Sequence, residues 1–473
     1  MHQLDQFYIG GQWVAPAVGG STIDIVNPAT ESVIGKLTMG STADVDRAVA
    51  AARAAFPAWS ATTRKEREAL LTRIIEHYST RLDDIANAIH ESIGAPLWLC
   101  KARQAPLGLQ ILQSALAALQ KMEFVEQLGS AEVTREPIGV AALITPWNWP
   151  AGTIAGKVGY ALAAGCTVVL KPSEVTPLDA RIFAEIIHEA GTPAGAFNMI
   201  FGEGPVVGAA LSRHDDVDVI SITGSTRAGV QVATDAAPTV KRVLQELGGK
   251  SPNVILEDAD LKAAVSDGVI NVMINSGQTC VAPTRMLVPR TLMDQAVAIA
   301  AATAAALPIG DPASPDSKVG AMASRAQFEK VQRMIEIGIE DGTQLVAGGP
   351  GLPEGVNKGY FVRPTIFANV SNDATIAREE IFGPVLVMIP YDSEEEAIAI
   401  ANDTEYGLAA YVWSGDTDRA RRVAQRLRAG SVRINGAAAN PAAPFGGYRR
   451  SGNGRELGVH GLAEYLEYKS ITI

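Results

Sequence analysis

The chain has 473 residues, of which 47% are hydrophobic and 19% are charged. This apolar share is enough to fill sizeable cores, and the length predicts about three domain-sized units. Its formal net charge of -11 would repel the phosphates of nucleic acids and the head groups of anionic lipids. Nucleic acids and membrane surfaces are therefore not expected as partners, and we expect chemistry on a small molecule instead.

The N-terminal residues MHQLDQFYIGGQWV contain no basic stretch followed by an apolar segment, so they do not predict a secretory signal. The longest apolar run, residues 296–307, is shorter than the roughly 18 residues that a membrane span requires. The three cysteines, Cys100, Cys166 and Cys280, match neither a disulfide framework nor a zinc-ligand pattern. We expect a cytoplasmic protein without a metal site.

The first third of the chain is predicted to be largely helical. Apolar residues repeat at helical spacing from Val45 to Phe56, and Pro57 is expected to end this helix. The residues TRKE at 63–66 form a predicted capping box for the next helix. Its apolar stripe continues to Tyr78, and no obvious catalytic cluster lies in this third.

From residue 138 onwards, short β-rich runs alternate with helical stretches such as 177–191. The runs are at 138–145, 166–171, 196–201, 217–223 and 251–257. Such alternation predicts a parallel sheet with helices on both faces, and ligands bound beyond the carboxyl ends of its strands. A second α/β stretch runs from about 250 to 448. The last residues, 461–473, alternate like a strand whose partner is another segment or another subunit.

Cys280 lies in the segment NSGQTCVAPTR, residues 275–285, between a helix-like run and a strand-like run. A loop on a rigid scaffold is a common place for a reactive group, but a packed thiol is an equally good interpretation of this segment alone. A reactive thiol needs a pKa below the free value of about 8.5, which requires positive charge or donated hydrogen bonds nearby. No Lys, Arg or His lies within four residues of Cys280. Any activation must therefore come from elsewhere in the fold or from a bound cofactor.

Two other polar residues follow apolar runs. Glu246 precedes Gly248 and Gly249, and a carboxyl group held close to apolar surface has a raised pKa that suits a general base for water. Asn148 lies between two tryptophans in ITPWNWP, residues 144–150, where its amide is able to donate to an oxyanion. Taken singly, Glu246 also fits a surface residue at a strand end, and Asn148 fits a turn residue flanked by prolines.

Four further segments have features of a dinucleotide site. Residues 168–174, VVLKPSE, end a strand with polar groups for a ribose, and the glutamate favours NAD because it repels a 2′-phosphate. The glycine-containing turns at 201–208 and 222–229 would present N–H groups to a pyrophosphate, although neither has the strict dinucleotide spacing. Residues 378–386, REEIFGPVL, offer a carboxylate and an aromatic ring for the nicotinamide end. Each segment alone also fits an ordinary turn or loop.

Taken in order, the segments PWNWP, KPSE, TGSTRAG, ELGGKSP, GQTC, EEIFGPV and PFGGYRRSGNGRELG closely resemble the aldehyde dehydrogenase superfamily, of the NAD(P)-dependent, hydrolytic and non-acylating type. The resemblance extends from about residue 20 to the end of the chain. The ordered series is highly specific, although its single parts are not.

The resemblance implies an α/β fold with three parts. A Rossmann-type NAD-binding domain would contain residues 1–118 and 139–248, and an α/β catalytic domain would contain residues 249–448. A small bridging β element for oligomerisation would consist of residues 119–138 and 456–473. This element would explain the unpaired terminal strand, and it predicts a homodimer or a homotetramer.

The resemblance also implies roles for individual residues. Cys280 would be the nucleophile, Asn148 the oxyanion donor and Glu246 the general base, with Lys157 and Glu456 supporting the activation of water. The residues that would bind the cofactor are, in chain order, Trp147, Lys171, Ser173, Glu174, Gly204, Gly224, Ser225, Gly229, Leu247, Glu380 and Phe382. The cofactor would be NAD, and a glutamate at position 174 still allows NADP.

In this scheme the Cys280 thiolate adds to an aldehyde, hydride leaves for NAD, and water deprotonated by Glu246 hydrolyses the thioester to a carboxylic acid. One alternative is a CoA-acylating semialdehyde dehydrogenase, and Glu246 argues against it because acylating relatives commonly lack this base. The other is a non-catalytic structural protein with this fold. The presence of the nucleophile, the amide and the base argues against this second alternative.

The substrate itself is less well indicated by the sequence. Residues 434–447 correspond to a family loop near the substrate entrance, and its alanines at 437–439 and 442–443 are small and uncharged. An uncharged, bulky or aromatic aldehyde is therefore expected rather than a carboxylated semialdehyde, which would need an arginine.

Overall fold

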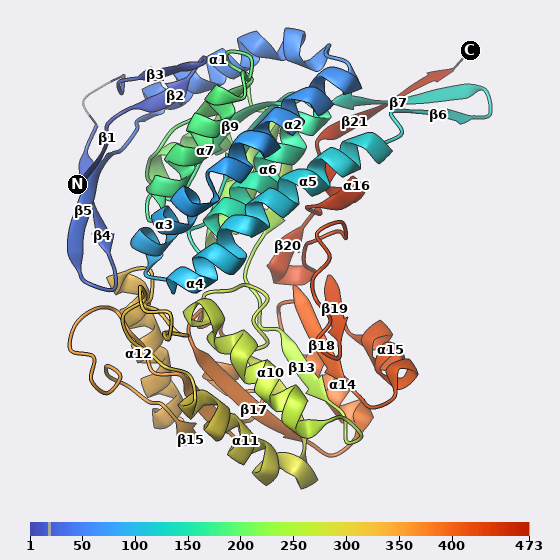
Figure 1. Cartoon of the computed structure of the whole chain (residues 1–473). Coiled ribbons are helices and arrows are strands. Elements are labelled where there is room, and N and C mark those ends of the chain that lie inside the picture. Colours follow the sequence, from blue (N-terminus) through green and yellow to red (C-terminus); the bar gives the residue numbers. More distant parts are fainter. Residues whose placement is uncertain (18–19, 473) are drawn as a thin grey trace.

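The structure is a computed structural model that describes residues 1–17 and 20–472. Two large sheets, each flanked by helices, form the upper and lower halves of the molecule in the view of Figure 1. Two three-stranded sheets complete the fold. The mixed α/β class predicted from the alternation of strands and helices is thus confirmed.

The first large sheet has eight strands, and its five central strands are parallel. In spatial order they are β20 (Gly452–Asn453), β12 (Arg242–Glu246), β11 (Val219–Thr223), β8 (Val140–Ile144), β9 (Thr167–Lys171), β10 (Phe197–Met199), β2 (Phe7–Ile9) and β3 (Gln12–Val14). From β8 the chain proceeds outward to β10, then returns to the other side of β8 through β11 and β12. This reversal of strand order is the doubly wound arrangement, in which ligands bind at the carboxyl ends of the strands.

Helices cover this sheet on both faces (Figure 1). They are α1 (Thr42–Ser60), α2 (Arg64–Thr80), α3 (Leu82–Ile93), α4 (Leu97–Leu99), α5 (Ala105–Lys121), α6 (Pro150–Ala164), α7 (Pro177–Glu189), α8 (Ala209–Arg213), α9 (Thr226–Ala236) and α16 (Gly458–Ala463). In α6 every residue except Thr153 is buried, because it lies between the sheet and α5. Among the described residues, no helix combines the length and the apolar character that a membrane crossing requires.

Two local predictions for the helices have different outcomes. The expectation that Pro57 ends the first helix is wrong, because α1 continues to Ser60. Pro57 lies in the last turn, where its missing N–H deprives only one carbonyl, that of Arg53, of its usual donor. The capping box of α2 is confirmed, since the Thr63 N–H donates to Glu66 Oε2 at 2.7 Å and the Glu66 N–H donates to Thr63 Oγ1 at 3.3 Å.

The second large sheet has seven strands, which are parallel except for β15. In spatial order they are β15 (Gln344–Ala347), β16 (Thr365–Ala368), β17 (Val385–Tyr391), β14 (Arg285–Pro289), β13 (Pro252–Ile255), β18 (Ala409–Trp413) and β19 (Ser431–Ile434). The helices of this half are α10 (Leu261–Met273), α11 (Met293–Ala305), α12 (Arg325–Glu340), α13 (Thr375–Arg378), α14 (Glu394–Asn402) and α15 (Thr417–Arg426).

The two small sheets lie at the periphery. One contains β1 (His2–Leu4), β5 (Ser32–Thr38) and β4 (Thr22–Asn27). The other contains β21 (Leu466–Thr472), β7 (Ala131–Pro137) and β6 (Val125–Leu128), and it projects away from the two halves (Figure 1). The terminal strand therefore pairs within the chain, antiparallel to β7, with Leu466 opposite Pro137 and Thr472 opposite Ala131.

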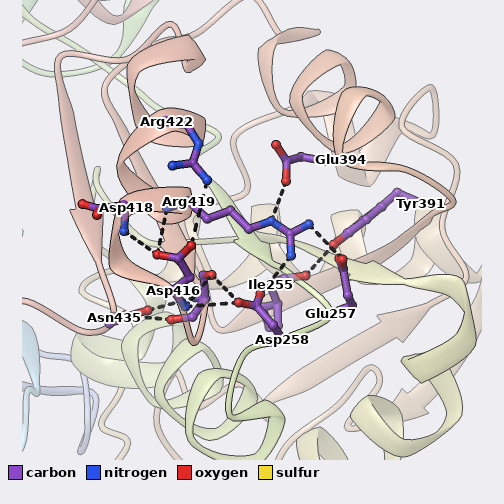
Figure 2. A network of polar contacts seen from close by, with 11 residues as sticks. Ile255, Glu257, Asp258, Tyr391, Glu394, Asp416, Asp418, Arg419, Arg422 and Asn435 are labelled. Carbon is purple, nitrogen blue, oxygen red and sulfur yellow. Dashed lines mark hydrogen bonds and ion pairs between the residues drawn. The ribbon is translucent and has the colours of Figure 1, made fainter.

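Arg419 on α15 holds this helix against the carboxyl end of β13 (Figure 2). Its guanidinium contacts the carboxylates of Glu394 at 2.8 Å, Glu257 at 2.9 Å and Asp258 at 3.3 Å. Asp258 is fixed in turn by Ser414, whose hydroxyl donates to Oδ2 at 2.8 Å. Three carboxylates around one guanidinium form a network, and such a network contributes more to the free energy of unfolding than an isolated surface ion pair does.

We predict that Arg419→Met lowers the free energy of unfolding by about 1–2 kcal/mol, because three carboxylates lose their common partner. Arg422→Met on the same helix is the control, since the Arg422 side chain is 66% exposed and lies 3.9 Å from Asp416. We expect the control to change stability by less than about 0.5 kcal/mol. Chemical denaturation measures both variants, and equal effects would contradict the role of the network.

Candidate active site

Four of the site residues predicted around the first sheet lie at or just beyond the carboxyl ends of its parallel strands. Asn148 follows β8, Lys171 ends β9, Gly224 follows β11 and Glu246 ends β12. In the second sheet the relation is reversed: Cys280 precedes β14, and the segment from Glu380 to Phe382 precedes β17. The site thus lies where the carboxyl ends of one sheet meet the amino ends of the other.

The segment before Cys280 is a turn of unusual backbone conformation. Asn275, Ser276 and Gly277 have φ angles of 52°, 56° and 73°, all in the left-handed region. A side chain at Gly277 would overlap the backbone of Gly383, so both the φ angle and the close approach require glycine. Left-handed non-glycine residues cost roughly 1–3 kcal/mol each and persist where the surroundings determine the conformation. The turn is therefore held by tertiary contacts, and it fixes the position of Cys280.

Cys280 differs from the other two cysteines in exposure. Cys100 and Cys166 are buried in the core of the first half, whereas Cys280 is half-buried. Desolvation and the carboxyl groups of Glu246 and Glu380 raise the pKa of Cys280 to about 12. Among the described residues, no cation is one of the main causes of this pKa shift, in agreement with the absence of basic residues near Cys280 in sequence. In the protein alone the thiol is protonated at neutral pH.

Glu246 is a buried carboxyl group whose surroundings disfavour its charged form. Its side chain is 3% exposed, and neither carboxyl oxygen has a hydrogen-bond partner among the described residues. Burial and the charge of Glu456 raise its pKa well above the ordinary value, and the cations of Lys157 and Arg455 partly oppose this. A carboxyl group with free lone pairs and a raised pKa has the properties of a general base for water.

Lys157, which is buried, and Glu456, which is partly buried, form an ion pair whose charges act on Glu246. The Lys157 ammonium donates to Glu456 Oε1 at 2.5 Å and to Ser221 Oγ at 2.7 Å. Lys157 is fully buried, and among the described residues its ion pair is with this carboxylate. The structure thus brings both predicted supporting residues together with the predicted base.

Asn148 contacts the cysteine segment directly. Its side-chain Nδ2 donates to the carbonyl of Gln278 at 3.0 Å, and the side chain is buried. The next residue, Trp149, donates from Nε1 to Thr279 Oγ1 at 3.0 Å. The PWNWP turn is therefore attached to both residues that precede Cys280, and the second N–H of the Asn148 amide remains for a ligand.

The predicted nicotinamide end is assembled from both halves of the molecule. Glu380 Oε1 accepts a hydrogen bond from the Gly249 N–H at 2.9 Å, and a side chain at Gly248 would overlap this carboxylate. The rings of Trp147 and Phe382 meet edge to face, with centroids 5.5 Å apart and planes at 85°. An acidic group beside an aromatic pair is suited to a sugar and a flat ring.

At the predicted adenosine end, Lys171 is buried and its ammonium donates to Glu174 Oε2 at 3.3 Å. Ser173 Oγ accepts from the Val175 N–H at 3.2 Å and forms a tight turn. Ser225 caps α9, accepting from the Ala228 N–H, and a side chain at Gly204 would meet nothing within 4 Å. The helix terminus and the open turn leave N–H groups available for phosphate.

Three of the predicted cofactor residues have structural contacts of their own. The Gly229 carbonyl accepts from Gln245 Nε2 at 2.7 Å, and a side chain at this glycine would overlap Leu247. The Leu247 side chain is buried. The Gly224 N–H donates to the backbone carbonyl of Glu246 at 3.0 Å. These contacts fix the turn after β11 against the base.

Sequence reasoning missed the residues that hold the 380–382 segment. On α12, Gln327 Nε2 donates to the carbonyls of Ile381 at 3.2 Å and Phe382 at 2.8 Å, and Lys330 Nζ donates to the Glu380 carbonyl at 3.0 Å. These two side chains lie one turn apart on an amphipathic helix. Nothing in their spacing distinguishes them from a solvated helix face.

Comparisons with known proteins match nearly the whole chain. The model of the aldehyde dehydrogenase family matches residues 13–471. A 3-succinoylsemialdehyde-pyridine dehydrogenase from a Pseudomonas species is 52% identical over 472 residues, covering 100% of this chain and 99% of the relative.

Solved structures agree with this relationship. A cysteine-to-alanine mutant of aldehyde dehydrogenase C from Pseudomonas syringae, complexed with NAD+ and octanal, has a TM-score of 0.98 and 53% identity, covering 99% of this chain and 96% of that chain. An NAD+ complex of Mycobacterium tuberculosis aldehyde dehydrogenase has a TM-score of 0.97 and 41% identity, covering 100% and 98%. The fold and these relatives define an α/β oxidoreductase built on two large sheets. The chain belongs to the aldehyde dehydrogenase family.

We predict that Glu380→Gln shifts the alkylation profile of Cys280 to lower pH. Loss of this carboxylate removes one cause of the raised thiol pKa, so the thiolate forms at lower pH and the rate with iodoacetamide rises there. Glu379→Gln is the control, because Glu379 is exposed and does not act on this pKa. Bound NAD+, which carries a positive ring, should shift the profile in the same direction. Superimposable profiles for Glu380→Gln and wild type would contradict this electrostatic account.

Proposed function

We propose that the protein oxidises an uncharged aldehyde to the carboxylic acid through a covalent intermediate on Cys280. NAD-dependent oxidation of an aldehyde is the activity of the family to which the chain belongs. The observation that carries the mechanism is the convergence of three groups: a half-buried thiol, a buried carboxyl group without a hydrogen-bond partner, and an amide bonded to the cysteine loop.

The Cys280 thiol first loses its proton to solvent. The thiolate Sγ then adds to the carbonyl carbon of the aldehyde, and the electron pair of the C=O π bond moves to the carbonyl oxygen, which becomes an oxyanion. The second N–H of the Asn148 amide, together with the backbone N–H of Cys280, donates to this oxyanion. A preorganised donor of this kind stabilises a transition state by roughly 2.7–4 kcal/mol. The aldehyde carbon then loses hydride, and the product is a thioester on Cys280.

The residues present fit NAD. An acidic group and an aromatic pair, Glu380 with Trp147 and Phe382, are suited to the nicotinamide riboside. Lys171, Ser173 and Glu174, at and after the end of β9, would bind the adenosine ribose, and the start of α9 would bind the pyrophosphate. When bound, NAD supplies the ring that accepts the hydride. The Glu174 carboxylate favours NAD over NADP, since a 2′-phosphate beside it would be repelled, while NADP remains a slower alternative.

Glu246 takes a proton from a water molecule that attacks the thioester carbon. The carbon–sulfur bond breaks, and the acid leaves. Because the pKa of Glu246 is raised, the base is protonated at low pH and becomes competent as pH rises through this value. Burial is the main cause of the raised pKa; the charge of Glu456 raises it further, and the charges of Lys157 and Arg455 lower it.

No observation supports either alternative, a CoA-acylating semialdehyde dehydrogenase or a non-catalytic structural protein. A CoA-acylating enzyme would not need Glu246 poised beside the cysteine. The relatives described above are named as dehydrogenases, and two of the structures contain NAD+, which gives no support to a structural protein without activity.

The proposed substrate is an uncharged aldehyde with a bulky, aromatic or aliphatic tail. The loop that contains Ala437 and Ala443 lies against the helices of the first half, since the Ser114 hydroxyl donates to the Pro441 carbonyl at 2.8 Å. Its alanines are exposed and present no charge. The Pseudomonas relative is named for a pyridine-bearing semialdehyde, and the P. syringae structure contains octanal. Neither of these aldehydes carries a carboxylate.

The bridging sheet supports the proposed division into three parts and a homodimer or homotetramer. Its outer strands, β6 and β21, have free edges, and Val125, Leu128, Tyr468 and Ile471 on this sheet are 43–57% exposed. Exposed apolar side chains on an open sheet edge favour pairing with another strand. A second copy of this chain is the proposed partner, and the cytoplasm is the proposed location.

We predict that Cys280→Ala abolishes NADH formation with an aldehyde in the absence of CoA, because the thioester cannot form. Asn148→Ala should lower kcat by about 10²–10³, since one oxyanion donor is lost. Cys166→Ala is the control for cysteine loss, because Cys166 is buried in the core away from the site. A Cys280→Ala variant with wild-type turnover would contradict the proposed mechanism.

We predict that kcat/KM for hexanal and benzaldehyde exceeds that for succinic semialdehyde at neutral pH. The loop near the site offers alanines where a carboxylate would need a cation. NADH formation with each aldehyde at saturating NAD+ measures the order. A higher value for succinic semialdehyde would show that the proposed substrate class is wrong.

A further inference from the structure

A chain of buried carboxamides lies behind the proposed oxyanion site. Gln104, Asn275 and Gln278 are each 1% exposed, and the reaction described above uses none of them. Buried polar groups cost free energy unless they are hydrogen-bonded, and hydrogen-bonded networks favour one arrangement of the atoms. The side-chain amides of Asn275 and Gln278 have partners for both their oxygen and their nitrogen, whereas Gln104 Oε1 has none among the described residues. The bonds of this network end on Asn148.

Asn275 is the centre of the network. Its Nδ2 donates to the Asn148 carbonyl at 2.9 Å and to the Gln278 carbonyl at 3.2 Å. Its backbone carbonyl accepts from Gln278 Nε2 at 3.1 Å. Asn275 also has a left-handed backbone, a conformation that asparagine tolerates better than most residues. The side chain and the backbone carbonyl of Asn275 thus both form hydrogen bonds within this network.

Asn148 is held at two points by the same segment. Its side chain donates to the Gln278 carbonyl, and its own carbonyl accepts from Asn275. The carboxamides of Asn148 and Asn275 therefore share one acceptor, two residues before Cys280. Without the Asn275 amide, the Asn148 carbonyl would lose its hydrogen bond from Asn275 Nδ2. The Gln278 carbonyl, which accepts from the Asn148 side chain, would lose its second donor, Asn275 Nδ2.

Gln104 connects this arrangement to the helical layer of the first half. Its Nε2 donates to Asn275 Oδ1 at 3.0 Å, which fixes which way the Asn275 amide faces. Gln104 ends a π-helical turn, Cys100–Gln104, that leads into α5. Such turns are rare and occur frequently at functional sites. Here the π-helical turn places the buried Gln104 amide within hydrogen-bond distance of Asn275 in the cysteine segment.

We propose that Asn275 and Gln104 are positioning residues that hold the Asn148 amide in the orientation that donates to the oxyanion. This inference rests on the proposed function, in which Asn148 stabilises the oxyanion on the Cys280 adduct. Asn275 acts on the reaction only through Asn148, and Gln104 acts only through Asn275.

A double-mutant cycle tests the proposal. Asn275→Gly removes the amide and keeps the left-handed backbone, and it should lower kcat for an aldehyde 10–100-fold with less than a threefold change in KM for NAD+. In an Asn148→Ala background the same substitution should lower kcat less than threefold, because the group it positions is gone. A residue with a merely structural role would reduce activity by the same factor in both backgrounds, and that result would overturn the proposal.

Two further variants keep the test decisive. Gln104→Met removes the donor to Asn275 at similar size without altering the turn, and it should lower kcat more weakly than Asn275→Gly, again only when Asn148 is present. Asn198→Ala is the matched control, since it removes another buried carboxamide, whose Nδ2 donates to the carbonyls of Val168 and Gly195 and not to the Asn148 turn. Its kcat should stay within threefold of wild type, and a loss equal to that of Asn275→Gly would overturn the proposal.

Failure of the proposed function gives a different result. If Asn148→Ala alone retained full kcat, the oxyanion role of Asn148 would be wrong, and the positioning role would be wrong with it. If Asn148→Ala lost activity but Asn275→Gly and Gln104→Met did not, the oxyanion role would stand and only the positioning role would fall.

Discussion

The left-handed turn at residues 275–277 is the constraint on which the site depends. It lets the backbone pass close to Gly383 and brings the carbonyl of Gln278 to the Asn148 amide. Asn148 follows β8 of the first sheet and Cys280 precedes β14 of the second, so this contact connects the two halves of the molecule. The positions of the thiol and of the amide are determined by one short segment.

Electrostatics complement this geometry. The pKa values of Cys280 and Glu246 are both raised, chiefly by desolvation and further by neighbouring carboxyl groups. In the protein alone, the proposed nucleophile is therefore protonated at physiological pH, and burial favours the protonated form of the proposed base more than in an exposed glutamate. Glu380 acts on Cys280 and also faces the proposed nicotinamide site. A positive ring bound there would offset the charge that disfavours the thiolate, so the same carboxylate favours the cofactor and restrains the thiol in its absence.

The sequence predicted the strands and the order of the proposed site residues because these depend on local patterns. Buried parallel strands read as apolar runs, and chemical groups follow them at the carboxyl ends. The terminal strand alternated visibly, but its partner, β7, lies more than 300 residues away in sequence. Pairing between segments so far apart has no local signal.

Other features depend on three-dimensional contacts that spacing does not encode. Gln327 and Lys330 bond backbone carbonyls of the 380–382 segment, and a helix pattern gives no indication of which polar residues do so. Asn275 stands within the cysteine segment itself, but its importance follows from the Asn148 carbonyl and from its φ angle. Pro57 did not end α1. It lies in the last turn, where the loss of one backbone hydrogen bond still allows the helix to continue to Ser60.

The central claim is that a thioester on Cys280 is hydrolysed by water that Glu246 deprotonates. The most direct measurement is rapid mixing of the Glu246→Gln variant with NAD+ and an aldehyde, followed by mass analysis of the quenched protein. The account predicts a burst of about one NADH per subunit, very slow turnover afterwards, and an acyl adduct on the peptide that contains Cys280. Steady turnover at the wild-type rate, without a burst or an adduct, would contradict it.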